Sequence, residues 1–205
     1  NTERVKVFDA TSTWSLDFMA EPLTTLDIAL EGSPAHEGIC VNRDGTILWI
    51  SSRATRTVER YTGDTASGFA RDNNFQIDLP DQSGWQGFKG MALSLDETSL
   101  FVADDTDGAE QILILDASTG AILPESFSVL QQGRTNPFDV ALDSQGNVYV
   151  AQYLERRVEK YVWQEHPPTP TPTPVDQHAT PEVRALWVTR WDYTTPAHVI
   201  SILTN

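Results

Sequence analysis

The sequence predicts an all-β fold, a partial β-propeller of about three and a half four-stranded blades. One pattern, repeated three times, carries this prediction, in residues 38–51, 90–103 and 139–151. Each copy has a short apolar strand, a turn that contains Asp or Gly, and a second apolar strand with an aromatic residue. Asp and Gly supply the positive φ angles and local hydrogen bonds that tight hairpin turns need. The copies recur about every 50 residues, a spacing typical of propeller blades.

Two further strands are expected in each blade. Third strands should follow the hairpins at residues 58–61, 112–115 and 158–161, and residues 5–8 match them as the third strand of an earlier blade. Outer fourth strands are expected at residues 25–30, 75–79 and 127–130. The first and last blades are then incomplete, and an open sheet edge invites unwanted pairing. We therefore expect the chain to be an internal piece of a longer protein, with roughly two more blades and a closing strand supplied from outside it.

A spacer of alternating Pro and Thr, residues 167–174, follows the third repeat. Proline fixes φ, removes an amide donor and favours extended neighbours, so this stretch predicts a stiff, solvated polyproline II segment. Such a segment holds folded units apart. We therefore divide the chain into a partial propeller at 1–163, a Pro/Thr-rich linker at 164–181 and a second unit at 182–205.

The second unit predicts the first β-α unit of a truncated (β/α)8 barrel, the TIM barrel. Residues 185–188 form an apolar strand pattern, and Thr195 and Pro196 suit the N-cap and first turn of a helix. Strand, short loop and helix in this order begin such a barrel. Because a barrel strand needs both of its neighbours, we expect residues 182–205 to be poorly packed and to lie away from the propeller.

The third repeat shows a family resemblance most clearly. It combines Pro137, an Asp-x-x-Gly-Asn turn at 143–147 and the pattern Arg-Val-x-x-Tyr at 157–161. In these features residues 1–163 resemble the NHL-repeat family and, more loosely, the six-bladed propellers of the gluconolactonase type. Residues 182–205 resemble the start of the glycosyl hydrolase-like family 10 domain, through the strand that reads Arg-Ala-Leu-Trp-Val-Thr-Arg-Trp.

The gluconolactonase resemblance implies a Ca²⁺ ion on the propeller axis, held by Glu, Asn and Asp of the innermost strands. The matching residues here are Glu37, Asn136 and Asp139, each close to the start of a first strand. Lys89 stands at the same level of the second blade, and its ammonium would repel a metal ion. Our main expectation is therefore no cofactor, with Ca²⁺ as the alternative. The acidic loop at 104–110 lacks the ligand spacing of an EF-hand and is expected to be solvated.

The barrel resemblance implies a sugar-binding role for residues at the tip of its first strand, because strand tips face the active site in such barrels. These residues are Arg190, Trp191 and Asp192, although the tryptophan could instead plug the barrel mouth. Trp85, in a Gly-rich connection, suits either stacking on a sugar or packing as a lid over the propeller face. Glycoside hydrolysis needs two carboxylates across the scissile bond, so we expect no catalytic residue within this chain.

Charge and cysteine content exclude several classes of function. The 205 residues carry 14 basic and 29 acidic side chains, a formal net charge of −15. Nucleic acid and anionic membranes attract the opposite charge, so neither is an expected partner. The single cysteine, Cys40, rules out an internal disulfide. It lies in an apolar strand pattern, which predicts a buried, inert thiol.

These observations predict a non-catalytic propeller that binds a carbohydrate or protein ligand at its face, or serves as a scaffold. It would belong to a secreted or cell-surface protein of bacterial type, whose barrel, largely outside this chain, is a glycoside hydrolase acting on carbohydrate. The Pro-Thr spacer favours this location, because secreted carbohydrate-active enzymes often use such linkers. Two alternatives stay open: a Ca²⁺-dependent hydrolase of the gluconolactonase type, and an NHL propeller for protein–protein interaction.

Overall fold

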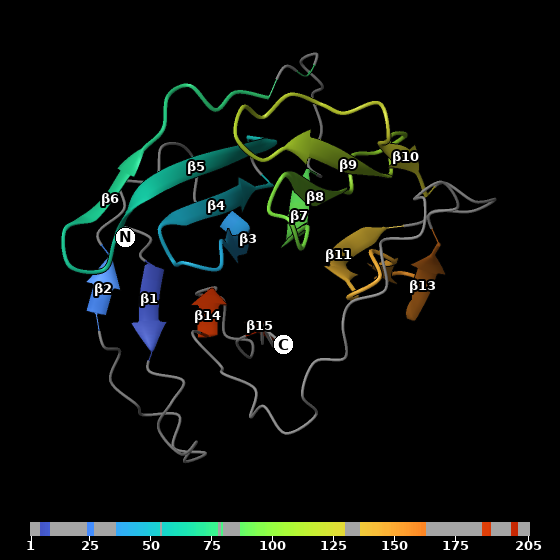
Figure 1. Ribbon diagram of the computed structural model, residues 1–205. Coiled ribbons are helices and arrows are strands. Elements are labelled where there is room, and N and C mark those ends of the chain that lie inside the picture. The colour runs from blue at the N-terminus through green and yellow to red at the C-terminus, as the bar shows by residue number, and fades with distance from the viewer. Residues whose placement is uncertain are drawn as a thin grey trace, which may run out of the picture.

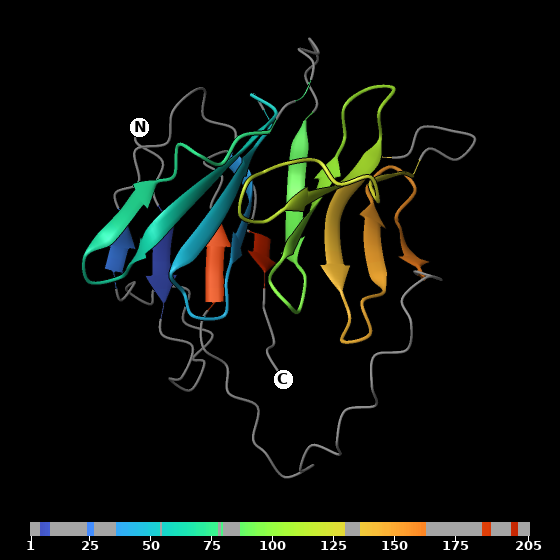
Figure 2. The same ribbon diagram turned by 45° about the horizontal axis from the view of Figure 1, so that its top comes forward.

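The computed structural model describes residues 5–8, 24–26, 36–53, 55–77, 79, 87–129, 136–162, 186–189 and 198–200. These residues form four antiparallel sheets and no helix, which agrees with the all-β prediction. The sheets stand side by side and follow chain order from β3 to β13 (Figures 1 and 2). Within these residues, accordingly, no helix has the length and apolar character needed to cross a membrane.

The first complete sheet joins four consecutive strands, β3 (His36–Val41), β4 (Ile47–Ser52), β5 (Thr57–Asp64) and β6 (Gly68–Arg71). Asn42 fixes the turn between β3 and β4, because its side-chain oxygen accepts hydrogen bonds from the backbone amides of Thr46 and Ile47, both at 2.8 Å. Gly45 supplies the positive φ, 70°, that this turn needs. The hairpin predicted here is confirmed.

The next two sheets repeat this hairpin. One contains β7 (Phe88–Leu93), β8 (Ser99–Asp104), β9 (Gln111–Asp116) and β10 (Phe127–Ser128), and the other β11 (Pro137–Leu142), β12 (Val148–Gln152) and β13 (Arg157–Tyr161). In each of these turns a carboxylate takes the part of Asn42 and accepts from backbone amides. Asp96 accepts from Thr98 at 3.2 Å, and Asp143 accepts from Gln145 and Asn147, both at 2.9 Å. The three predicted repeats are thus confirmed as hairpins of one design.

The outer strand of the first complete sheet differs from the prediction. It is β6, and residues 75–77 form no strand. The cause is a tight turn, in which the Asp64 carboxylate accepts hydrogen bonds from the amides of Ala66 and Ser67 at 2.8 and 2.7 Å. The chain therefore turns back at once, and Phe75 packs instead in the core between the first two complete sheets.

The remaining sheet joins segments from the two ends of the chain. It contains β1 (Val5–Phe8), β2 (Thr24–Leu26), β14 (Leu186–Thr189) and β15 (His198–Ile200), in the order β15-β14-β1-β2. β14 pairs antiparallel with β1, so that Trp187 lies opposite Val7, and β15 pairs with β14 (Figure 1). The strand expected at residues 185–188 is therefore present, but it belongs to a sheet with β1.

Two expectations for the second unit are wrong. His198–Ile200 is a strand where a helix was expected, and the segment after the spacer does not lie apart from the propeller strands. Val199 and Ile200 are β-branched, and such residues favour a strand where a neighbouring strand offers hydrogen-bonding groups. Pairing with β14 also removes part of the edge that β1 would otherwise expose. The barrel and the domain boundaries stay predictions.

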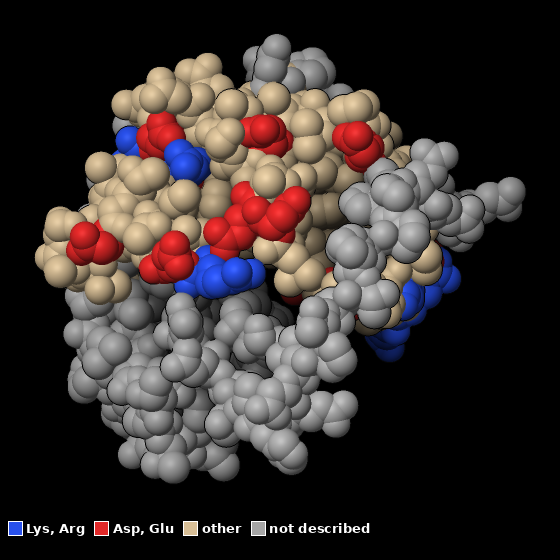
Figure 3. All heavy atoms as spheres, in the orientation of Figure 1, with Lys and Arg blue, Asp and Glu red and all other residues tan. Residues whose placement is uncertain are grey.

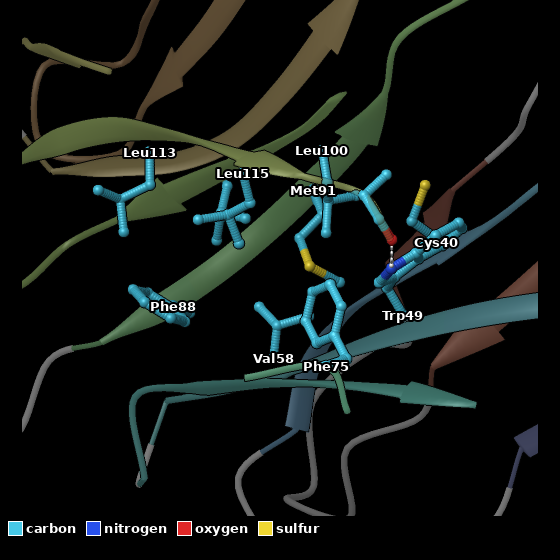
Figure 4. Packing of buried hydrophobic residues seen from close by; sticks show 11 residues of the cluster. Cys40, Trp49, Val58, Phe75, Phe88, Met91, Leu100, Leu113 and Leu115 are labelled. Carbon is cyan, nitrogen blue, oxygen red and sulfur yellow. Dashed lines mark hydrogen bonds between the residues drawn. The ribbon is translucent and has the colours of Figure 1, made fainter. Parts of the chain in front are cut away.

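The core lies between neighbouring sheets. Trp49 and Val58 of the first complete sheet meet Met91 and Leu100 of the second (Figure 4). The Trp49 indole Nε1 donates to the Ala117 carbonyl oxygen at 3.2 Å, so the ring is held in orientation as well as buried. The first interface therefore combines apolar packing with a hydrogen bond that crosses it.

The second and third complete sheets meet in the same way. Ala103 and Ile112 pack with Val140, Val148 and Val150, and all five are buried. A fully buried aliphatic side chain of this size stabilises a fold by about 1.5–3 kcal/mol. The second complete sheet thus buries one face against the first and the other against the third.

Cys40 is a buried thiol, as predicted, and belongs to the first interface. Burial raises its pKa to about 12. The thiolate, which is the reactive form, is therefore scarce at neutral pH. The residue acts as a small apolar side chain.

Leu100→Ala should destabilise the fold by about 2–5 kcal/mol, because it opens a cavity between the first two complete sheets. Leu100 is 0% exposed, whereas Leu95, in the turn before the same strand, is 59% exposed. Leu95→Ala is the matched control and should change stability by less than about 0.5 kcal/mol. Chemical denaturation of both variants measures the difference. Equal losses would contradict this location of the core.

Candidate functional site

The inner strands β3, β7 and β11 begin at one end of the sheets and bring their first residues together. Gly38 and Gly90 mark the points where these strands approach most closely. A side chain at Gly90 would place its Cβ 1.8 Å from Asp139 Oδ1, and one at Gly38 would come within 2.5 Å of the Lys89 carbonyl oxygen. The absence of side chains at these two positions therefore allows the polar residues beside them to meet.

Lys89 is the centre of this cluster. It is only 5% exposed, and its Nζ lies 2.9 Å from Glu37 Oε2 and 3.9 Å from Asp105 Oδ2. The second carboxylate oxygen of Glu37, Oε1, lies 3.0 Å from Arg53 Nε. Figure 3 shows acidic and basic side chains adjoining on one face of the molecule. A buried ammonium needs such partners, because an unpaired charge is costly inside a protein.

Asp105 is the second buried charge of the cluster. Its Oδ1 accepts a hydrogen bond from the side-chain amide of Asn136. Asn136 directly precedes β11, the first strand of the next sheet. Burial raises the pKa of Asp105 to about 7, although Lys89 acts in the opposite direction. The carboxyl group therefore exchanges a proton near neutral pH. Burial also raises the pKa of Asp139, whose Oδ1 accepts from the Val140 amide at 2.9 Å.

Each of the three candidate calcium ligands has a neighbour within the protein. Glu37 is bound to Lys89 and Arg53, Asn136 donates to Asp105, and Asp139 lies against Gly90. The described residues contain no group of three or more His, Cys, Asp or Glu side chains that could hold a metal ion. The sequence predicts that Lys89 lies at the level of these ligands, and its Nζ is indeed 2.9 Å from Glu37 Oε2.

The acidic loop after β8 differs from its prediction. Asp104, Asp105 and Thr106 are buried, although a solvated loop was expected. Asp104 pairs with Arg56 at 2.8 Å and also accepts from the Gln111 side-chain amide at 3.0 Å. The tip of the loop, Asp107 and Gly108, is exposed, as predicted. In the sheet register Asp104 lies opposite Phe88, and the Asp105 amide donates to the Gly87 carbonyl oxygen, so Asp105 lies beside the entry to β7.

Arg56 links the first two complete sheets. Its backbone has a positive φ of 51°, and its guanidinium pairs with Asp104 and lies 5.8 Å from the centre of the Phe88 ring. A positive φ is unfavourable for a side chain of this kind, so the pairing must offset some strain. Arg156, just before β13, repeats this conformation with a φ of 52°.

The four remaining candidates are Trp85, Arg190, Trp191 and Asp192, which lie outside the described residues. Their sugar-binding roles stay predictions of the sequence.

Comparison with known proteins supports the fold. The periplasmic gluconolactonase of Pseudomonas aeruginosa matches 89% of this chain with a TM-score of 0.51 and 15% sequence identity. A luciferin-regenerating enzyme matches 63% of the chain with a TM-score of 0.47 and 14% identity. A catalytically inactive virginiamycin B lyase from Staphylococcus aureus, solved with quinupristin, matches 64% with a TM-score of 0.43 and 13% identity.

All three of these structures are β-propellers. The match to the gluconolactonase shows that the fold is of the β-propeller type. The chain spans 40–44% of the length of these proteins. No protein-family model matches the sequence, and neither does any curated protein. The resemblances to NHL repeats and to the glycosyl hydrolase-like barrel stay predictions.

Asp105→Asn should flatten the pH dependence of stability between about pH 4 and pH 7. The pKa of Asp105 is about 7 in the folded protein and ordinarily 3.8, so folding takes up a proton in this window. Its contribution to stability is fully present below about pH 4 and is lost as the pH rises through about 7. Asparagine does not titrate. Urea midpoints measured across this range test the slope.

Asp116→Asn serves as the control for this series. Hydrogen bonds from Ser118 and Thr119 lower the pKa of Asp116 to about 2, so its titration lies below the window. This variant should keep the wild-type slope between about pH 4 and pH 7. If Asp105→Asn kept that slope as well, a buried, protonating carboxyl at position 105 would be ruled out.

Proposed function

We propose that this chain is a non-catalytic binding module of the β-propeller type, whose inner strand ends are held by an internal lysine rather than by a metal ion. One observation carries the proposal. The Lys89 ammonium lies between the carboxylates of Glu37 and Asp105, in the region where the axial ligands of a metal would converge. A hydrolase that depends on Ca²⁺ would need this region free for the ion.

Electrostatics support this reading. Ca²⁺ takes 6–8 oxygen ligands at 2.3–2.6 Å, so it would need both carboxylates and most of the space near them. Glu37 is already engaged on both oxygens, by Lys89 at 2.9 Å and by Arg53 at 3.0 Å. A divalent ion at the same place would also meet the repulsion of two cationic side chains. Burial strengthens that repulsion, because the local dielectric is low.

The ligand proposed for the propeller face is a carbohydrate or a protein. The Pro-Thr spacer and the resemblance of residues 182–205 to a glycosyl hydrolase-like domain support carbohydrate, and they support an extracellular or cell-surface location. On this proposal the module would serve a glycoside hydrolase whose barrel lies mostly outside the chain. The net charge of −15 argues against nucleic acid and anionic membranes as partners.

A Ca²⁺-dependent hydrolase of the gluconolactonase type is the second candidate. Its support is the fold shared with the Pseudomonas gluconolactonase and the presence of Asp139 and Asn136 at the inner strand ends. This candidate requires Lys89 to leave its carboxylate partners when the ion binds. The two candidates therefore differ in one measurable property, the affinity of the inner strand ends for Ca²⁺.

Calorimetric titration should find no micromolar Ca²⁺ binding to the wild-type chain. Lys89→Met should bind Ca²⁺ more tightly than wild type, because it removes the ammonium that competes for Glu37 and Asp105. It should also lose about 3–5 kcal/mol of stability, the usual cost of breaking a buried ion pair from one side. Circular dichroism checks that it still folds, and Lys89→Gln is a second variant with a similar expected gain.

Asp64→Ala is the matched control, because Asp64 is an exposed carboxylate in the outer hairpin of the first complete sheet, between β5 and β6. It should leave Ca²⁺ binding unchanged, both in the wild type and in the Lys89→Met variant. Micromolar binding by the wild type that Asp139→Ala abolishes, together with Ca²⁺-dependent hydrolysis of a sugar lactone, would establish the hydrolase and end the proposal of a metal-free binding module.

A further inference from the structure

The last sheet repeats side chains with which the first complete sheet packs on the second. In both sheets a cation of the third strand lies opposite an aromatic residue of the second strand. The Arg60 guanidinium is 5.9 Å from the centre of the Trp49 ring, and the Lys160 ammonium is 5.2 Å from the centre of the Tyr149 ring. The two surfaces therefore share one design.

The two sheets differ in what covers this surface. Val58 and Val158 begin the apolar part of their third strands, opposite Ser51 and Ala151. Val58 is 5% exposed, because the second sheet packs on it, whereas Val158 is 66% exposed. A hollow of about 360 Å³ lies beside Val158, and Arg156 also lines it. We call this surface the last-sheet face, formed by Tyr149, Arg156, Val158 and Lys160.

An arginine directly precedes the third strand in both sheets. Arg56 and Arg156 have the same left-handed backbone, with φ angles of 51° and 52°. The Arg56 guanidinium reaches the second sheet, where it pairs with Asp104 at 2.8 Å and lies 5.8 Å from the centre of the Phe88 ring. The side chain of Arg56 is only 10% exposed and that of Asp104 is 0% exposed. At the first interface, the covering sheet thus supplies a carboxylate to this arginine.

Arg156 has no such carboxylate. Its side chain is exposed and forms no ion pair or hydrogen bond with the residues that the structure describes. Its neighbours are already paired within the last sheet. Arg157 Nη2 lies 2.7 Å from Glu155 Oε2, and Lys160 Nζ lies 3.7 Å from Asp143 Oδ2. Arg156 is therefore available to a partner that covers this face.

We propose that the last-sheet face binds a β-sheet with the chemistry of the second complete sheet, and that Arg156 receives a carboxylate from it, as Arg56 receives Asp104. The partner is a propeller sheet from outside the described strands, with Asp or Glu at the end of its second strand. A guanidinium that is removed from water needs a charged partner, and its planar fork fits a carboxylate. Charge complementarity of this kind also fixes the register of the two surfaces.

The first sheet of a second copy does not have this chemistry. β14 contacts β3 as β4 contacts β7 and as β8 contacts β11, so β14 holds the place of a second strand. It ends at Thr189, where β8 ends at the acidic Asp104. A second copy would therefore bring no carboxylate from that strand end to Arg156.

A cyclic peptide of residues 87–105 tests the contact on the full chain. It carries the β7–β8 hairpin, with Phe88 and Asp104, that packs on the first complete sheet. Cyclisation is needed because an isolated hairpin is only marginally stable in water. The labelled peptide should bind the chain with a saturable rise in fluorescence anisotropy. The same peptide with Asp104→Asn should bind at least about tenfold more weakly, because it cannot form the buried ion pair.

Arg156→Gln in the full chain should weaken binding of the unchanged peptide by a similar factor. The Asp104→Asn peptide should then bind this variant no more weakly than the unchanged peptide does, because the two substitutions remove one interaction. Arg156 is exposed, so the variant should keep its fold, which circular dichroism checks. Arg157→Gln is the matched control, since Arg157 is paired within its own sheet, and it should leave the preference for the unchanged peptide intact.

Equal affinity of the two peptides for the wild-type chain would overturn the proposal, and so would the absence of saturable binding. Light scattering of the chain without peptide should find single chains. A dimer that Val158→Asp dissociates would identify a second copy as the occupant of the face and would overturn the proposal too.

Discussion

The inner strands pack side by side because glycine occupies the two points where they meet. Any side chain at Gly38 or Gly90 would overlap the neighbouring strand, at the Lys89 carbonyl in one case and at the Asp139 carboxylate in the other. Ser51 uses this closeness, since its hydroxyl accepts from the Gly38 amide at 2.8 Å and donates to the Lys89 carbonyl at 2.6 Å. The apolar core between the sheets and the polar cluster at their ends both depend on this spacing.

Polar groups at the strand ends are then forced to pair with one another, because the same approach that packs the core removes them from water. Lys89, Glu37 and Asp105 form one such group, and Arg56 with Asp104 forms another. Breaking a buried pair from one side is strongly destabilising, since it leaves an uncompensated charge. Buried charges that stabilise each other in this way connect the sheets.

Local features were predictable, and contacts between distant segments were not. The turns after β3, β7 and β11 followed from Asn, Asp and Gly, whose side chains bond amides only a few residues away. The outer strand was expected at 75–79, yet Asp64 makes an earlier turn and β6 takes that place. In the candidate site, the level of Lys89 on the inner strands was predicted correctly, whereas Asp105 was expected to be solvated. The burial of Asp105 could not be predicted, because its partner Asn136 comes from another sheet.

The sequence by itself determined the repeat, the hairpin turns, the all-β class and the acidic charge, because periodicity and turn chemistry act over neighbouring residues. The tertiary structure alone decided which faces of the sheets are buried. It also decided which carboxylates form an ion pair with a lysine or arginine side chain. It also decided that β14 and β15 extend the sheet of β1, although Val199 and Ile200 follow a helix-initiating pair in the sequence. The physical reason is that strand pairing and charge burial depend on residues far apart in the chain, whose meeting depends on the packing of whole sheets.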